Sequence, residues 1–272
     1  MTKLKHKLRN FFIWCITVIG VVRVYRVWAR QSGPLVRVLV FHDIHSRRWF
    51  EHLLEDLTLW FHFVTPEEFH AQKFHSEKVN LLITFDDGYA SWESAALSVL
   101  EELNLKALFF VNSALLDIAH DPMGTEVFMR ERLLIGPHAP LTWEGVKKLH
   151  NAGHTIGGHS CTHPNLTKLS KEEVVGEILD DKHAIERHIN STLTDFAYPF
   201  GTRSYVNQNV QTVALDVGYG YLYTATSGFV DFDTPFAISR MCVESDIHSR
   251  ALKRWVLGGY DIFLMVKKLC VR

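Results

Sequence analysis

Short apolar runs rich in strand-forming side chains alternate along the chain with segments whose apolar residues recur at helical spacing. Strands that alternate with helices usually form a parallel sheet with crossover helices, so the pattern predicts an α/β fold. Seven units of this kind favour a barrel over a doubly wound sheet. The stretch 114–141 has no clear pattern and is expected to be a long loop that serves as a lid or binding loop. The seven strands are predicted at 36–42, 80–85, 107–112, 154–158, 195–200, 219–225 and 236–243.

Several helices are predicted between these strands. Apolar residues on one face predict a helix within 89–103. Thr142 is a plausible N-cap for a helix over 142–152. Ser170 and Glu173 have the spacing of a capping box and predict the start of a further helix.

Both ends of the chain combine positive charge with apolar residues. Residues 11–22 (FFIWCITVIGVV) are uncharged, but a helix of this length spans only roughly 18 Å of a ~30 Å hydrocarbon core. The N-terminus is therefore interpreted as a short signal anchor, as an amphipathic helix in the membrane plane, or as a cleaved signal peptide. No small-residue cleavage site supports the last of these. The basic tail 250–272 is interpreted as a closing helix or as a second membrane contact.

Composition and charge narrow the class of protein. The chain has 272 residues, 47% apolar and 22% charged, which is ordinary globular usage and excludes disordered and coiled-coil classes. Residues 31–249 carry 16 basic and 29 acidic groups, a net charge of −13, which argues against nucleic-acid binding. We therefore expect a membrane-associating segment at 1–30, a barrel at 31–249 and a basic amphipathic tail at 250–272. The expected location is a membrane, with the side left open.

Four polar clusters follow predicted strands directly. The carboxyl ends of parallel strands meet at one end of a barrel, where sites form, so we expect the clusters to lie together. No G-x-S-x-G elbow, Walker loop or G-x-G-x-x-G motif is present, so serine-triad and nucleotide-binding chemistry lack support. The clusters are FHD at 41–43, TFDDG at 84–88, HSCTH at 159–163 and YPFG at 198–201.

Two of these clusters have residues suited to a metal site. Asp86 and Asp87 are adjacent carboxylates that repel each other unless a cation or proton intervenes, so one could bind a metal while the other acts as a base. His159 and His163 have a spacing that suits two imidazoles on one ion. With one carboxylate they would form a set suited to Zn²⁺, Fe²⁺, Co²⁺ or Ni²⁺. The alternatives are a simple Asp-Asp-Gly turn and two surface histidines.

Together, TFDDG at 84–88, HSCTHPNL at 159–166 and the variant YPFG at 198–201 resemble the signatures of NodB-homology polysaccharide deacetylases, carbohydrate esterase family 4. The resemblance covers about 36–243. It implies a distorted (β/α)₇ barrel and metal-dependent removal of acetyl groups from sugars.

The resemblance also implies roles for individual residues. Asp87, His159 and His163 would bind one divalent ion, with Zn²⁺ favoured over Co²⁺, Ni²⁺ or Fe²⁺. Asp86 would be the general base that deprotonates the attacking water. The backbone N–H of Phe200 would stabilise the oxyanion.

Aromatic residues near the same loops could stack on the faces of sugar rings, although each is also compatible with ordinary packing. Phe200 is the favoured candidate because it lies beside the oxyanion turn. The other candidates are Trp143, Tyr198 and Tyr205.

Two positions depart from the usual family pattern. The third motif lacks an arginine to orient the base, and Arg240 is the candidate replacement; its alternative is an ordinary salt-bridging residue. The late Leu-x-His motif is missing. Permuted members similar to poly-N-acetylglucosamine deacetylases place this histidine before the aspartates, as FHD at 41–43 does. His42 is therefore assigned as the general acid, with capping of the first strand as its alternative.

The leading expectation is a membrane-tethered N-deacetylase of an N-acetylhexosamine polysaccharide or lipid-linked glycan, active on cell-envelope or secreted polymers. The expected partners are the glycan and the membrane surface. One alternative is an O-acetyl esterase or a deformylase on the same scaffold. A second is a non-catalytic glycan-binding protein, which the altered third motif and the missing late histidine would permit.

Overall fold

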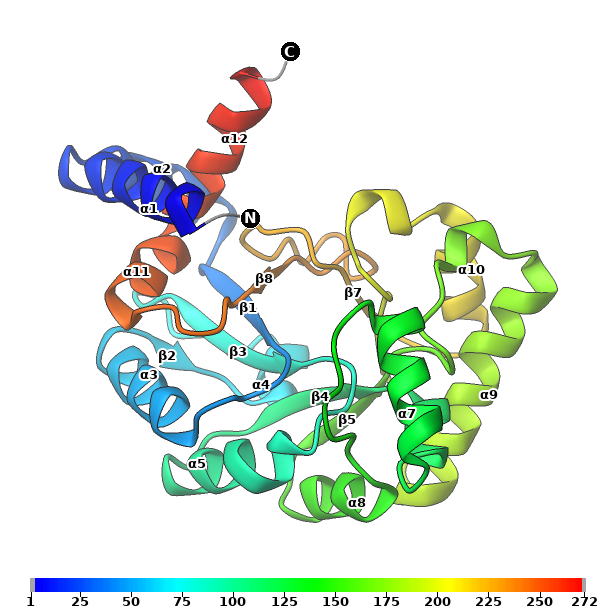
Figure 1. The fold of residues 1–272 in the computed structure, drawn as a ribbon. Coiled ribbons are helices and arrows are strands. Elements are labelled where there is room, and N and C mark those ends of the chain that lie inside the picture. The colour runs from blue at the N-terminus through cyan, green and yellow to red at the C-terminus, as the bar shows by residue number, and fades with distance from the viewer. Residues whose placement is uncertain (1–2, 271–272) are drawn as a thin grey trace.

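The computed structural model describes residues 3–270, in which a curved parallel sheet is surrounded by helices (Figure 1). The strands follow the order β7-β6-β5-β4-β3-β1-β8, and the short β2 also pairs with β3. All named pairs are parallel. The strands are β1 (Val36–Phe41), β2 (His62–Phe63), β3 (Asn80–Phe85), β4 (Ala107–Val111), β5 (Thr155–Gly158), β6 (Asp195–Ala197), β7 (Tyr221–Tyr223) and β8 (Arg240–Cys242).

The two edges of the sheet approach each other, so that the barrel is nearly closed. Val38, Leu39 and Val40 of β1 pair with β8. On the other edge, Tyr223 forms a parallel bridge with Ile238, which lies just before β8. The α/β barrel predicted from the alternating pattern is therefore confirmed in architecture.

Both faces of the central strands are buried, which explains their continuous apolar runs. Val36 and Val38 of β1 pack with Leu82 of β3 in one cluster. Leu39 of β1 and Ile83 of β3 belong to a second, larger cluster beneath the helices. Successive residues of one strand thus face the barrel interior and the helix layer in turn.

The helices lie mainly outside the sheet. Thr142 caps α8 by accepting a hydrogen bond from the Gly145 N–H, and Ser170 and Glu173 form the capping box of α9, as predicted. The α-helices are α1 (Lys3–Val18), α2 (Val21–Ala29), α3 (Arg47–Trp60), α4 (Pro66–His70), α5 (Leu97–Glu102), α6 (Ser113–Asp117), α7 (Pro122–Phe128), α8 (Trp143–Asn151), α9 (Lys171–Ile189), α10 (Gln208–Asp216), α11 (Ser249–Arg254) and α12 (Tyr260–Cys270).

Short 3₁₀ and π turns complete the secondary structure. The helix predicted within 89–103 begins as the π turn η2 and continues as α5. The 3₁₀ turns are η1 (Arg30–Ser32), η4 (Leu166–Lys168) and η5 (Arg203–Tyr205), and the π turns are η2 (Trp92–Ala96), η3 (Met129–Leu133) and η6 (Trp255–Gly259).

The segment 114–141 is not the structureless loop that its sequence suggested. It contains most of α6, all of α7 and the turn η3. Asp121 caps α7 through the Met123 N–H, and Pro122 occupies the first helical position. Each element is too short to give a helical repeat, and their apolar residues form a small cluster of their own around Met129.

The first and last helices lie at one corner of the molecule, where α1 and α2 contact α11, η6 and α12 (Figure 1). Gly20 separates α1 from α2 with a φ of 88°. Arg9 anchors α1 through two hydrogen bonds to Glu244, of 2.6 and 2.9 Å, and Ile13 is buried beneath it. Within residues 3–270 no single helix is long and apolar enough to cross a membrane; α1 and α2 reach that length only as a pair bent by 76°.

Candidate active site

A cavity of about 400 Å³ opens at the carboxyl ends of the strands. Residues that follow β1, β3, β5, β6, β7 and β8 form its wall. The structure therefore brings together segments that are distant in sequence. The predicted site residues in this wall are His42, Asp86, Asp87, His159, His163, Tyr198, Phe200 and Arg240.

Asp86 is held by Arg240 in a two-pronged ion pair. The Nη1 and Nη2 atoms of Arg240 each donate to one carboxylate oxygen at 2.7 Å, and its Nε donates to the Thr224 carbonyl at 2.9 Å. Burial alone would raise the pKa of Asp86, but the Arg240 charge, followed by the charge of His159, holds this pKa below its usual range. Asp86 is thus a fixed, ionised carboxylate.

Asp87 faces the same cavity because the chain turns sharply after β3. Its φ of 88° and the 107° of Gly88 lie in the left-handed region, so the two adjacent carboxylates do not point to opposite sides as they would in a strand. Tyr89 donates its hydroxyl to Asp87 Oδ2 at 3.1 Å. Burial would raise the pKa of Asp87, but a hydrogen bond from the protonated form of His159 and the charge of His42 outweigh burial and hold this pKa well below its usual value.

The two imidazoles are oriented toward Asp87 by backbone carbonyls. His159 Nδ1 lies 2.7 Å from the Ala197 carbonyl, and His163 Nδ1 lies 3.2 Å from the Arg132 carbonyl. A carbonyl can only accept, so each Nδ1 carries the proton and each Nε2 offers a lone pair in the neutral ring. These Nε2 atoms lie 3.5 and 3.7 Å from Asp87 Oδ1.

The two histidines differ in their electrostatic surroundings. Burial lowers the pKa of His159, but Asp86 and Asp87 outweigh this and raise it above its ordinary value. Burial and the neighbouring His159 lower the pKa of His163 to about 4. His163 is therefore neutral near pH 7, in the form that binds metal ions.

The donor atoms of Asp87, His159 and His163 fit a divalent transition metal. One ligand atom of each residue lies within 4.8 Å of the other two, and all three residues are buried. Two nitrogens and one carboxylate oxygen are the donor set of a Zn²⁺ site that keeps positions open for water or substrate. The carbonyl partners of both Nδ1 atoms are the usual outer support of such ligands.

Of the remaining predicted residues, His42, Phe200 and Tyr198 line the cavity, whereas Trp143 does not. His42 is an exposed residue of the cavity wall. Phe200, with a φ of 61°, lies against His163 with ring centroids 4.5 Å apart and against Tyr205 at 4.7 Å. Tyr198 borders the cavity but is only 1% exposed, so its ring is a wall rather than a stacking platform.

Trp143 does not reach the cavity, contrary to the prediction that it binds the sugar. Its ring stacks on His188 at 3.7 Å, and its Nε1 donates to Asp117 Oδ1 at 2.9 Å. Trp143 begins α8, and these two contacts place its side chain against α6 and α9 rather than in the cavity lining. Trp143 is therefore close to the loops of the site in sequence but not in space.

Asp181 is a supporting residue that the sequence reasoning missed. It lies in α9, fully buried, and accepts hydrogen bonds from the backbone N–H groups of Ser113 at 2.9 Å and His159 at 3.1 Å. Burial raises the pKa of Asp181 to about 7. Its position three residues after Ile178, on the apolar face of α9, was the signal that could have identified it.

Comparisons with known proteins agree with this geometry. Residues 75–222, more than half of the chain, match the family model described as polysaccharide deacetylase. A chitin deacetylase of Cryptococcus neoformans is 27% identical over 56% of the chain, and YxkH of Bacillus subtilis, named for the same family, is 26% identical over 84%. A peptidoglycan-N-acetylglucosamine deacetylase of Listeria monocytogenes is 31% identical over 48% of the chain. The chain spans 79% of YxkH but only 28% and 22% of the fungal and Listeria proteins.

Solved structures share the fold at low sequence identity. The deacetylase PplD of Streptococcus pyogenes, in complex with acetate, has a TM-score of 0.68 and 19% identity, with 81% of this chain and 97% of that chain covered. IcaB of Ammonifex degensii has a TM-score of 0.68 and 20% identity over 83% and 98% of the two chains. With a family match over more than half its length and this barrel, the chain belongs to the polysaccharide deacetylase family.

Proposed function

We propose that this protein is a metal-dependent N-deacetylase of glycans that contain N-acetylhexosamine. The observation that carries the proposal is the convergence of Asp87, His159 and His163 beside the Asp86–Arg240 pair in one cavity. The named activities of the fungal and Listeria relatives, on chitin and on peptidoglycan N-acetylglucosamine, support an acetamido sugar as substrate.

In this proposal Asp87, His159 and His163 hold one divalent ion, with Zn²⁺ favoured by the donor set. When bound, such an ion acidifies water and polarises a carbonyl group. Asp86 is left to accept a proton, because both of its oxygens are oriented by Arg240 and none is needed as a ligand.

The other residues position the substrate and complete the proton transfers. Within residues 3–270 the Phe200 N–H donates no hydrogen bond, so it is free to stabilise an oxyanion. The exposed imidazole of His42 is the group proposed to protonate the leaving amine. Phe200 and Tyr205 together offer aromatic surface for a sugar ring.

The test is release of free amine and acetate from a panel of N-acetylated glycans, including chitin oligosaccharides and peptidoglycan fragments, with the metal content measured on the same sample. Equal amounts of amine and acetate support the proposal. Acetate without amine would show O-deacetylation, and formate would show a deformylase. Glycan binding without any product would show a binding protein on a deacetylase fold.

Replacing His42 with alanine is expected to lower turnover by about 100-fold while the metal content stays at the wild-type value. His42 lines the cavity but is not one of the three residues grouped as metal ligands. Turnover on glycans and elemental analysis measure the two effects. The exposed His120 provides the control as His120→Ala, and wild-type turnover in His42→Ala would remove the general-acid role.

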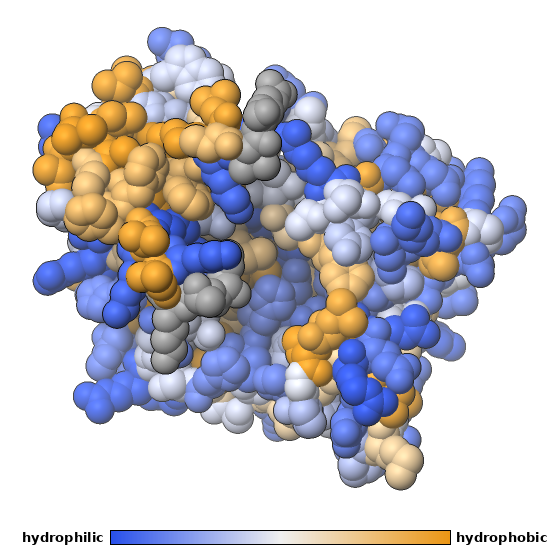
Figure 2. Space-filling view, turned by 45° about the horizontal axis from the view of Figure 1, so that its top comes forward, coloured by the Kyte–Doolittle hydropathy of each residue, from blue (hydrophilic) through white to orange (hydrophobic). Residues whose placement is uncertain are grey.

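We further propose that α1, α2 and α12 attach the protein to a membrane surface. Figure 2 shows apolar side chains gathered over the corner that carries these helices. Phe11 is 63% exposed and Trp28 also 63%, whereas Arg9 and Ile13 on the inner side of α1 hold it against the body. This arrangement favours helices lying in the membrane plane, and the nearby lysines and arginines favour anionic lipid.

The full chain is expected to sediment with phosphatidylglycerol vesicles and to bind neutral phosphatidylcholine vesicles at least several-fold more weakly. Replacing Phe11 and Trp28 together with serine should reduce sedimentation, since both side chains are exposed. Replacing the exposed Leu59 of α3 with serine is the matched control. Equal sedimentation of both variants, or self-association through this surface without vesicle binding, would contradict the proposal.

A further inference from the structure

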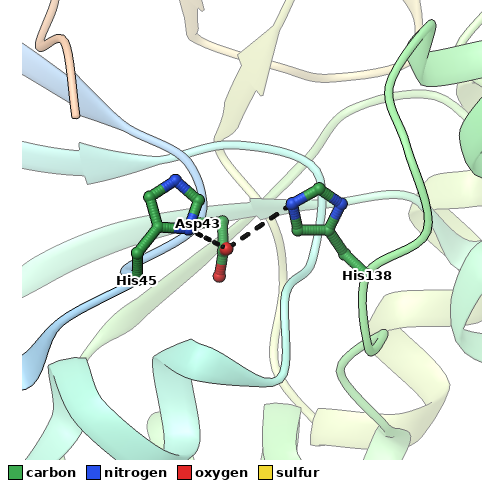
Figure 3. Close-up of side chains that lie close together, drawn as sticks. All are labelled: Asp43, His45 and His138. Carbon is green, nitrogen blue, oxygen red and sulfur yellow. Dashed lines mark ion pairs between the residues drawn. The ribbon is translucent and has the colours of Figure 1, made fainter.

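A second group of metal-binding side chains lies at the mouth of the same cavity. Figure 3 shows the Asp43 carboxylate between the imidazoles of His45 and His138. Asp43 Oδ2 lies 2.7 Å from His45 Nδ1 and 3.6 Å from His138 Nε2. One ligand atom of each residue lies within 4.8 Å of the other two. These three residues are called the rim cluster below.

The backbone around His138 selects the tautomer of its neutral ring that suits cation binding. Its Nδ1 lies 2.8 Å from the Gly136 carbonyl, which can only accept a hydrogen bond. The proton of the neutral ring is therefore on Nδ1, and the lone pair of Nε2 faces Asp43. A ring nitrogen held by a backbone carbonyl is the arrangement that supports histidine ligands in metal sites. The same device orients His159 and His163 in the first site.

The rim cluster joins two loops that are distant in sequence. Asp43 and His45 follow β1, whereas His138 precedes α8 (Figure 3). All three residues line the cavity. Tyr89 separates the rim cluster from the first site: its ring packs edge-on against His138 at 5.5 Å, and its hydroxyl bonds to Asp87. The two sites share a cavity but have no ligand in common.

We propose that the rim cluster binds a second divalent transition-metal ion, of the class of Zn²⁺, Co²⁺ or Ni²⁺. Two imidazoles and one carboxylate favour these ions over Ca²⁺ and Mg²⁺, which prefer oxygen ligands. The site is weaker than the first, because the His45 side chain is 52% exposed and must be ordered on binding. A bound ion connects the loop after β1 to the loop before α8 across the cavity mouth.

The test is titration of the metal-free full chain with Zn²⁺, with bound metal counted by elemental analysis after equilibrium dialysis. Wild type is expected to bind one ion tightly and a second at higher concentration. The variant His45→Ala/His138→Ala should keep the first ion and weaken the second by about 100-fold or more, a larger loss than outer-shell changes cause. The exposed His120→Ala is the control and should bind both.

Cobalt provides a second readout, because the visible absorption of bound Co²⁺ should develop in two steps in wild type and in one step in His45→Ala/His138→Ala. The variant Asp87→Asn/His163→Ala should lose the tight step and keep the weak one, which separates this proposal from the proposed catalytic site. Saturation of wild type at one ion would overturn the rim site. So would a second ion that binds the His45→Ala/His138→Ala variant with wild-type affinity while its circular dichroism shows a native fold.

Discussion

Asp86→Asn is expected to lower turnover on N-acetylated glycans by roughly 1,000-fold, within the range for loss of general acid–base catalysis. An amide has nearly the shape of the carboxylate but cannot accept the proton. The metal content should not change, because the grouped ligands are Asp87, His159 and His163. Turnover and elemental analysis on one preparation separate the two effects.

The same substitution should also destabilise the protein. Arg240 is 1% exposed and would keep its charge opposite a neutral amide. Breaking a buried ion pair on one side costs about 3–5 kcal/mol, which denaturant unfolding would detect. Asp180→Asn, an equal change of charge on the exposed side of α9, is the matched control. If Asp86→Asn retains activity within about threefold of wild type while Asp180→Asn behaves normally, Asp86 is not the base.

His163→Ala is expected to weaken binding of the tightly held metal ion by about 100-fold or more and to remove activity as a result. Three residues form the proposed first site, and the loss leaves one imidazole and one carboxylate. Added Zn²⁺ should restore little activity, because the variant also loses the packing of Phe200 against the His163 ring. Equilibrium dialysis with elemental analysis measures the affinity directly.

A substitution at a second buried histidine, His154, is the control for His163→Ala. His154 is also buried, but its Nδ1 accepts from the Ala107 N–H on the strand side, and it is not among the grouped ligands. His154→Gln should therefore keep the ion even if it lowers stability. Tight metal binding retained in His163→Ala, with the fold intact, would remove His163 from the proposed ligand set.

The sequence predicted the strands well where both faces of a strand are buried. β1 and β3 lie between the barrel interior and the helix layer, so each is a continuous apolar run. β2 was missed because it has only two residues and includes His62. α6 and α7 were missed for a related reason, since five and seven residues do not establish a helical period.

The site was predictable only in part. Asp86 and Asp87 are recognisable in the sequence as paired carboxylates after a strand. Arg240 was named as the residue that orients Asp86 only through the family resemblance, because the two residues lie 154 positions apart. Only the closure of the sheet by β8 brings them together. Trp143 was assigned to the sugar as an aromatic residue near the loops, and the fold instead stacks its ring on His188. A rim cluster of residues 43, 45 and 138 has no local sequence signature either.

The two-pronged contact of Arg240 with Asp86 has a consequence for how the protein can be dissected. The segment that matches the family model, residues 75–222, contains both aspartates and both proposed histidine ligands, but it ends before Arg240 and begins after His42. An excised fragment with those bounds would carry the three motifs at 84–88, 159–166 and 198–201 but lack the Arg240 cation that orients the proposed base. The residues that identify the family thus lie in the middle of this chain. The orientation of the proposed base, Asp86, depends instead on β8, the last strand to be synthesised.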